Sequence, residues 1–490
     1  MKKEFLLNLL LLVGINLLIK PFYAFGIDLQ VQNRVGLSAY GLYFALFNFS
    51  FLFQIITDLG IQQYNSRFVA QNPALAAKYL PHFLSLKAVL SVIFLGVSLV
   101  VAALMGYFDG THLPLLLPLL VNQLLITLIF YLRSNLSALQ YYRVDSLLSA
   151  IDKLILIAIM SFLLWGPFSK SFQIQHFIYA QTASFALTAL LAWLILFAKL
   201  KTAFKIRWNS AIMMSILKQS WPFALVVFLM TAYTRIDAVM LERLLPAGKG
   251  STEAGVYAFG YRLLDAFNMV GYLFASLLLP MFAKMLKDRE HLGELLRTAQ
   301  QWMLFLTITL SFCVLFFGDE LSGWMLKACD SYTVNVFQLL IWSSISSGII
   351  YVFGTLLTSN ANLRQMNSVF TIGILLNVVG NALLIPYYGA WAAALTTVIT
   401  QSFVAVAEIY LVFRLIPLAS SFFRFSEIWK ALLLSGGIYL LFGMANSWLN
   451  PFIDWRLSLL LAGFCSLAWA ETVGAVELRG FFQILKSKKQ

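Results

Sequence analysis

The sequence predicts an all-α polytopic membrane protein with about fourteen transmembrane helices, and three observations support this fold class. The chain of 490 residues is 61% hydrophobic and only 11% charged, and its mean hydropathy is +0.83, a composition that ordinary soluble domains do not approach. Apolar segments of about 20 residues, the length that spans a hydrocarbon core as a helix, follow one another along the chain. The short alternating strands and turn signals of a membrane barrel are absent from the sequence.

The predicted spans follow from these apolar segments. The first one begins after Met1-Lys2-Lys3 and lacks a small-residue cleavage site, so we expect an uncleaved helix. In order, the predicted spans cover residues 5–28, 39–60, 84–106, 113–135, 146–166, 174–198, 219–242, 255–282, 299–317, 334–357, 367–386, 389–413, 428–446 and 455–476.

The distribution of Lys and Arg predicts that both termini are cytoplasmic. With the N-terminus inside, the inner loops and tails hold about 21 of the 34 basic residues and the outer side about 6. The net charge of +13 then sets the topology and attracts the anionic inner leaflet, and it calls for no nucleic-acid partner. Three cysteines make no disulfide framework, and the four histidines have no metal-ligand spacing, so we expect no metal, no cofactor and no catalytic residues.

An internal repeat divides the predicted spans into two lobes. Residues 39–45 (AYGLYFA) recur as residues 253–259 (EAGVYAF), an offset of 253 minus 39, or 214 residues. Because six spans separate the copies, both enter the membrane in the same orientation, which predicts a pseudo-two-fold axis along the membrane normal. We therefore expect two six-helix lobes, at 1–210 and 211–420, followed by two further helices and a cytoplasmic tail over 421–490.

Two consecutive spans, 219–242 and 255–282, carry charged residues far from their ends. A charge near the middle of a bilayer costs about 2.5 to 3.5 kcal/mol on insertion scales, so such residues are candidates for function. Arg235 lies seven residues before the outer end of its span, and Arg262 seven residues after the start of the next. At 1.5 Å per residue both lie about 10 Å from the outer boundary, where they are able to meet.

A polar and aromatic stripe runs along the second of these spans. Its members recur at intervals of three or four residues, which places them on one face of a helix: Tyr257, Tyr261, Asp265, Asn268 and Tyr272. Such a face must contact protein or water, because lipid leaves its polar groups unsatisfied. We expect it to line a cavity.

The arginines support a functional and a structural interpretation. In the first, Arg235 and Arg262 form a cationic wall that receives an anion, and Asp237 and Asp265 hold the arginines in place or take up a coupling ion. In the second, Arg235 with Asp265 and Arg262 with Asp237 are ion pairs that tie two adjacent helices. The planar donor forks of two arginines suit a phosphate, which favours the first interpretation.

The first lobe is less charged at the equivalent positions. At the offset of 214, Asn48 corresponds to Arg262 and Phe51 to Asp265, so the predicted cavity is asymmetric. Asn48 and Lys20, which lies about fifteen residues into its span, complete the predicted cavity residues. Other charged residues lie near predicted cytoplasmic ends, where snorkelling or topology is the commoner explanation: Asp58, Arg67, Lys87, Asp152, Lys153 and Glu408.

Three stretches of the chain carry a family resemblance. They are Arg34-Val35-Gly36 with Tyr40-Gly41-Leu42-Tyr43, Asp58-Leu59-Gly60 and Arg67; Tyr233-Thr234-Arg235-Ile236-Asp237 with Gly255-Val256-Tyr257 and Tyr261-Arg262-Leu263; and Asn377 to Pro386 with Tyr388-Gly389-Ala390. Together they resemble Wzx-type polysaccharide and O-antigen flippases of the multidrug, oligosaccharidyl-lipid and polysaccharide exporter superfamily.

The resemblance implies a fourteen-helix exporter of the bacterial cytoplasmic membrane that opens alternately to each side. Its cargo would be a polyprenyl-diphosphate-linked oligosaccharide moved from the inner to the outer leaflet, with coupling to a gradient of H⁺ or Na⁺ and with other polysaccharide-assembly proteins as partners. Two alternatives stay open: an organic-cation or multidrug antiporter of the same fold, and a membrane glycan polymerase or ligase.

Overall fold

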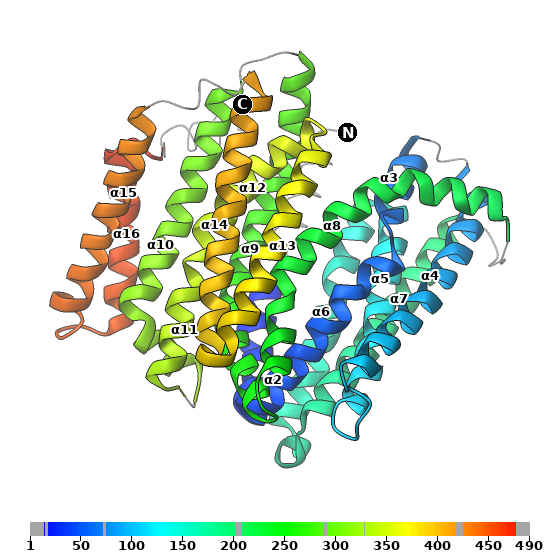
Figure 1. Cartoon of the computed structure of the whole chain (residues 1–490), viewed down its shortest axis with the longest axis horizontal. Helices are drawn as coiled ribbons and strands as arrows, with labels where there is room; N and C mark the ends of the chain where they lie inside the picture. The colour runs from blue at the N-terminus through cyan, green and yellow to red at the C-terminus, as the bar shows by residue number, and fades with distance from the viewer. Residues whose placement is uncertain are drawn as a thin grey trace. The chain divides into compact units, whose positions relative to one another are not determined.

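Every described element of the computed structural model is a helix (Figure 1), which confirms the predicted fold class. The structure describes residues 14, 18–71, 75–200, 208–288, 292–327, 329–417 and 425–476. Within these ranges, 12 helical segments are long and apolar enough to cross a membrane. The chain is therefore a multi-pass membrane protein.

The helices fall into two compact units, one formed by residues 1–258 with 381–389 and the other by residues 259–380 with 390–490. The first unit contains η1 (Phe22–Asp28), α2 (Leu29–Phe53), η2 (Gln54–Thr57), α3 (Ile61–Gln71), α4 (Ala76–Leu104), α5 (Leu113–Ala138), α6 (Tyr142–Trp165), η4 (Pro167–Ser171), α7 (Ile174–Leu200) and α8 (Ser210–Leu244). It also takes the start of α9 (Lys249–Asp288) and the end of α13 (Leu363–Tyr388).

The second unit contains the rest of α9 and α13. Its other elements are α10 (Gly293–Met325), α11 (Ser331–Ile341), α12 (Ser343–Ser359), α14 (Ala390–Leu415), α15 (Phe425–Met444), η6 (Ala445–Leu449) and α16 (Trp455–Thr472). Helix α12 packs between α10 and α14, and α15 with α16 forms an orange and red pair beside α10 (Figure 1). The lobe boundaries at residues 210 and 420 stay a prediction.

The sequence predicts fourteen spans, and twelve are found among the described residues. The first and the last predicted spans account for this difference. Half of the predicted span 5–28 lies outside the described residues. Its end continues into the next span, so that one helical path runs from Leu18 to Thr57. The last predicted span is present as α16 but carries Arg456 and Glu471 at its ends, which lowers its hydropathy. The predicted cytoplasmic tail after residue 476 also lies outside the described residues.

The path from Leu18 to Thr57 bends at Gly36, which has φ 84° and ψ 168° inside α2. Only glycine adopts such a φ without strain. Forty residues of helix would extend about 60 Å, twice the thickness of a hydrocarbon core, so this bend lets the segment form two arms. The sequence predicts that one span ends at residue 28 and the next begins at residue 39. In the structure the chain changes direction between these residues, but it does so inside a continuous helical path and not in a loop.

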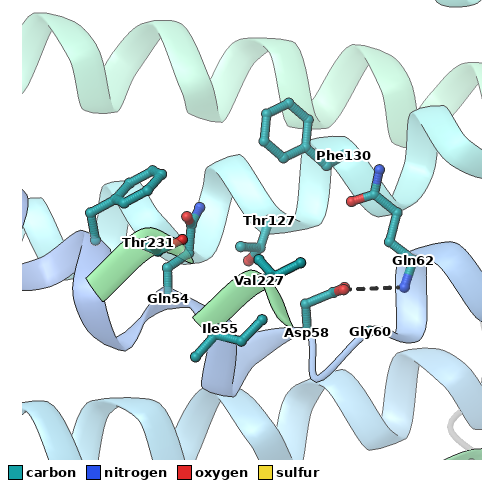
Figure 2. Close-up of a pocket in the computed structure, with 10 residues that line it drawn as sticks. Gln54, Ile55, Asp58, Gly60, Gln62, Thr127, Phe130, Val227 and Thr231 are labelled. Carbon is teal, nitrogen blue, oxygen red and sulfur yellow. Dashed lines mark hydrogen bonds between the residues drawn. The ribbon is translucent and has the colours of Figure 1, made fainter. Parts of the chain in front are cut away.

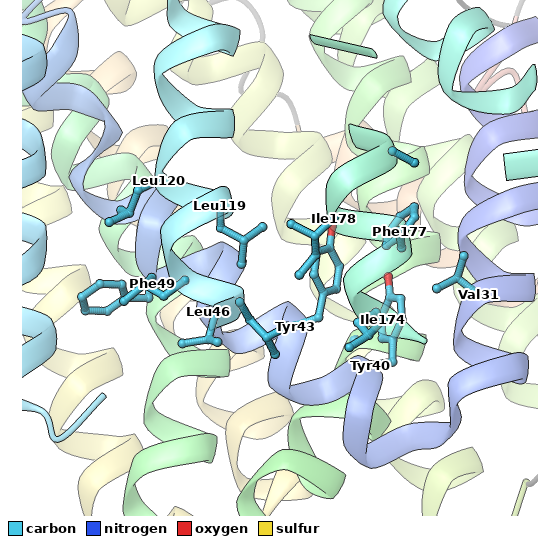
Figure 3. Close-up of a cluster of buried hydrophobic side chains, with 14 of the residues drawn as sticks. Val31, Tyr40, Tyr43, Leu46, Phe49, Leu119, Leu120, Ile174, Phe177 and Ile178 are labelled. Carbon is cyan, nitrogen blue, oxygen red and sulfur yellow. The ribbon is translucent and has the colours of Figure 1, made fainter. Parts of the chain in front are cut away.

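Both arms of α2 pack into the core of the first unit. Figure 3 shows Val31 from the first arm and Tyr43 from the second beside Phe177 of α7. The rings of Tyr43 and Phe177 meet edge to face, with centroids 5.2 Å apart, and Gln181 Nε2 donates to the Tyr43 hydroxyl at 2.8 Å. The core therefore joins α2 and α7 through one aromatic contact and one buried hydrogen bond.

Helices α2 and α9 cross with their backbones in contact. A Cβ atom at Gly41 would overlap the carbonyl oxygen of Ser251, and one at Gly255 would overlap the carbonyl oxygen of Leu37. Gln32 Nε2 also donates to the carbonyl oxygen of Gly255 at 2.8 Å. Gly41 and Gly255 are the same position in the two copies of the repeat, so the copies meet at equivalent glycines. Small residues permit this approach between helices in a membrane.

Candidate functional site

A cavity of about 140 Å³ lies in the first unit, between α2, η2, α3, α5 and α8 (Figure 2). Pockets for drug-sized ligands measure about 300 to 1,000 Å³, so this conformation has room here for one small group rather than for an oligosaccharide. The lining residues are Phe51, Gln54, Ile55, Asp58, Gly60, Gln62, Thr127, Phe130, Val227 and Thr231.

Asp58, one of the residues that line this cavity, forms an ion pair with Lys87 of α4. Lys87 Nζ lies 3.0 Å from Asp58 Oδ1, and it also donates to the carbonyl oxygen of Thr57 at 3.1 Å. Asp58 Oδ2 accepts from the backbone N–H of Gln62 at 3.2 Å, the contact drawn in Figure 2. Since the Lys87 side chain is only 6% exposed, snorkelling is the wrong explanation for it. The pairing was not predictable from the sequence because Lys87 lies in α4 and Asp58 in the turn between η2 and α3.

Arg235 lies beside the same cavity. Its guanidinium carbon is 5.4 Å from the centre of the Phe51 ring, and Thr231, one turn earlier on α8, lines the cavity. An arginine over an aromatic face is a cation–π contact, which holds the guanidinium group beside the cavity. Arg235 is half-buried.

Asp237 occupies a different face of α8 and is fully buried. The Tyr257 hydroxyl donates to its Oδ2 at 2.8 Å, and Asn381 Nδ2 donates to its Oδ1 at 2.6 Å. Both donors stabilise the ionised carboxylate. The structure thus brings together two predicted site residues, Asp237 and Tyr257, and adds Asn381, which the sequence analysis noted only as part of a motif.

The other predicted residues of the first unit lie apart from the cavity lining. Asn48 is buried and donates from Nδ2 to the carbonyl oxygen of Phe44 at 2.7 Å. Lys20 is half-buried, and the charges of Lys153, Asp152 and Arg133 act on it. The side chain of Arg67 lies outside the described part of the chain.

The remaining predicted residues belong to the second unit, on α9. Tyr261 and Arg262 are buried, with exposed fractions of 3% and 6%, whereas Asp265 and Asn268 are half-buried and Tyr272 is exposed. The stripe therefore changes from buried to exposed along the helix. The expected pairs of Arg235 with Asp265 and of Arg262 with Asp237 stay predictions.

Sequence reasoning missed a second polar cluster, at the end of α8. Glu242 accepts from the Tyr107 hydroxyl at 2.9 Å and lies 3.1 Å from His112 Nε2 and 3.1 Å from Arg243 Nε. The backbone N–H of His112 holds the pKa of Asp109 at about 2, so Asp109 stays ionised at neutral pH. Glu242 and Arg243 at the end of α8, together with Tyr107 and His112 between α4 and α5, thus fix the end of α8 to this connection.

A comparison with protein-family models identifies residues 6–286 as matching the family described as "Polysaccharide biosynthesis protein". This match covers more than half of the chain. A comparison with curated protein sequences gave no match.

Solved structures show the same fold. The lipid II flippase MurJ in an inward closed conformation has 18% sequence identity and a TM-score of 0.66, covering 96% of this chain and 98% of that chain. An inward-facing multidrug resistance MATE family transporter of the MOP superfamily has 13% identity and a TM-score of 0.61, covering 84% and 96%. A MOP superfamily transporter from Pyrococcus furiosus, described as having a binding pocket of reverse polarity, has 14% identity and a TM-score of 0.56, covering 84% and 94%.

Proposed function

Because the chain belongs to the polysaccharide biosynthesis protein family, we propose that it flips a polyprenyl-diphosphate-linked oligosaccharide, such as an O-antigen repeat unit, from the inner to the outer leaflet of the bacterial cytoplasmic membrane. Transport proceeds by alternating access and is coupled to an ion gradient, with both termini in the cytoplasm. The proposal includes no enzymatic step. The fold shared with a lipid II flippase supports a lipid-linked cargo.

The observation that carries this proposal is the pair of arginines inside membrane-spanning helices. Arg235 is held over the Phe51 ring beside the cavity of the first unit, and Arg262 is 6% exposed. A guanidinium binds a phosphate through two parallel hydrogen bonds, which an ammonium group does not reproduce. A diphosphate or an acidic sugar is the ligand that such side chains suit best.

Arg235→Ala and Arg262→Ala are each expected to lower translocation of a defined lipid-linked oligosaccharide by about 10 to 100-fold, the equivalent of losing a hydrogen bond to a charged group. The measurement is the rate at which purified protein moves the lipid across vesicles. Lys249→Ala, which removes one charge from an exposed position at the start of α9, is the matched control and should keep the wild-type rate. Wild-type rates in both arginine variants would contradict the cargo site.

An organic-cation antiporter is the second candidate, and one observation favours it: Asp58 lines the cavity of the first unit. A carboxylate suits a cation, and the fold is shared with MATE transporters. The arginine variants Arg235→Ala and Arg262→Ala also distinguish the antiporter from the flippase. Transport of an organic cation that persists after Arg235 and Arg262 are neutralised supports the antiporter.

Asp237 and Asp265 are proposed to hold the arginines or to take up the coupling ion. The two donors on Asp237 suit a fixed anion. Asp237→Asn is therefore expected to destabilise the protein by about 2 kcal/mol, because Tyr257 and Asn381 lose a charged acceptor. Thermal unfolding in detergent measures this change, and Tyr257→Phe should produce a smaller loss. An unchanged melting temperature together with lost gradient-driven transport would instead assign Asp237 to ion coupling.

A further inference from the structure

Glu408 of α14 is a carboxyl group inside the second unit, apart from the arginines and from the cavity of the first unit. Its exposed fraction is 0%, and neither carboxyl oxygen has a hydrogen-bond partner within the described residues. Snorkelling, the explanation that its place near a predicted cytoplasmic end suggested, is therefore wrong. A buried ionisable group in a membrane-spanning helix is a candidate for function by default.

The Glu408 side chain packs against Gly354 of α12, where the absence of a side chain leaves room for the carboxyl group. A Cβ atom at Gly354 would lie 3.0 Å from each of the two carboxyl oxygens, so the side chain sits directly on the backbone of α12. The helices run side by side in Figure 1. Two other polar pairs do form between these helices, since Ser347 Oγ donates to Gln401 Oε1 at 2.6 Å and Ser346 Oγ lies 3.0 Å from Ser402 Oγ. Glu408 is a carboxyl group without such a partner among the described residues.

No charge among the described residues compensates Glu408. The titratable groups of the second unit on the elements packed against it, and on its own helix, are Tyr332 of α11, Tyr351 of α12, Arg364 of α13, and Tyr410 and Arg414 of α14. Helix α13 also carries Tyr387 and Tyr388, in the part that belongs to the first unit. None of these lies within hydrogen-bond or ion-pair distance of the Glu408 oxygens in the described structure. An ionised carboxylate without partners costs several kcal/mol in such a site, and the neutral acid costs much less.

We propose that Glu408 is the proton-binding site of this transporter and that one proton bound there per cycle couples cargo movement to the proton gradient. This proposal rests on the proposed flippase function and identifies H⁺ as the coupling ion. The step is the reversible reaction of a carboxylate with a proton from water to give the carboxylic acid. In the conformation described here the neutral acid is the favoured form, because the carboxyl group is fully buried against α12 and its oxygens have no hydrogen-bond partner within the described residues.

Release of the proton requires α12 and α14 to separate. The carboxylate needs water around it, and Glu408 lies seven residues, about 10 Å, before the end of α14 at Leu415, which is predicted to be cytoplasmic. Proton release therefore belongs to a conformation that opens this end of the interface. Asp237 is not an equivalent proton-binding site, since Tyr257 and Asn381 donate hydrogen bonds that stabilise its ionised form.

Infrared difference spectroscopy of the purified protein between neutral and strongly alkaline buffers tests the site itself. The wild type should show the carbonyl stretch of a protonated buried carboxyl, Glu408→Gln should lack that band, and Glu408→Asp should show it at a shifted position. Glu427→Gln is the matched control, because Glu427 is a carboxylate of the same unit that pairs with Arg297 at 3.5 Å. A band that persists unchanged in Glu408→Gln overturns the proposal.

Proteoliposomes with a pH gradient and a clamped membrane potential test the coupling. One coupled proton supports at most about a tenfold cargo ratio per pH unit. Glu408→Gln is expected to keep downhill exchange of the lipid-linked oligosaccharide and to lose this accumulation, while Glu427→Gln keeps both. Accumulation at the wild-type level in Glu408→Gln overturns the coupling. If the wild type moves no lipid-linked sugar, the flippase proposal fails, and the infrared band still decides whether Glu408 holds a proton.

Discussion

Gly255→Ala is expected to remove most of the folded protein from the membrane. The added Cβ overlaps the backbone carbonyl oxygen of Leu37, and backbone atoms of two crossing helices cannot move aside as a flexible side chain does. Overpacking costs about 1 to 3 kcal/mol in most cores, and we expect about 3 kcal/mol here because the obstacle is backbone. Separation of the helices also breaks the hydrogen bond from Gln32 to Gly255.

The measurement is membrane abundance together with the melting temperature of the detergent-solubilised protein. Gly96→Ala is the matched control, because Gly96 lies within α4 of the same unit and a Cβ there meets nothing within 4 Å. That control should be neutral or slightly stabilising, since alanine favours a helix over glycine. Equal behaviour of the two variants would show that the backbone contact at Gly255 is dispensable. Gly41→Ala, at the equivalent position of the other repeat, should reproduce the loss.

The sequence was informative about the elements because a membrane span is a local property. About twenty apolar residues decide it, and the apolar segments therefore located the helices, including the change of direction near Gly36. The repeat also identified Gly41 and Gly255 as equivalent positions. The repeat did not predict that these two glycines contact each other. A two-fold axis relates equivalent positions whatever their distance from the axis, so equivalence alone does not imply contact.

The same limit applies to the candidate site. Periodicity placed Tyr257 on a polar face, but its partner Asp237 lies on another helix, and no spacing within one helix reveals that contact. For Glu408 and Lys87 the sequence favours snorkelling or topology, because the position of a residue along a span gives its distance to the end of the span and not its burial by neighbouring helices. Each is instead covered by protein, with exposed fractions of 0% and 5%. Charged residues near a predicted span end thus need a tertiary structure before their role is assigned.

Lys87→Met is expected to destabilise the protein by about 3 kcal/mol, because it leaves the Asp58 carboxylate, whose side chain is only 17% exposed, without its cation. Methionine keeps most of the lysine stem, so the loss reports the charge and the hydrogen bond to the Thr57 carbonyl rather than a new cavity. The double variant Lys87→Met with Asp58→Asn removes both charges and should recover most of the loss. Breaking a buried pair costs far more than replacing it with neutral groups.

Lys430→Met provides the exposed comparison for this cycle. Lys430 lies 3.7 Å from Glu427 and its side chain is 36% exposed, so its removal should cost less than about 1 kcal/mol. Chemical unfolding in detergent measures all four proteins. A double variant as unstable as Lys87→Met alone would assign the loss to packing around Lys87 rather than to the uncompensated Asp58 carboxylate. Recovery in the double variant instead shows that the loss in Lys87→Met comes from the uncompensated Asp58 carboxylate.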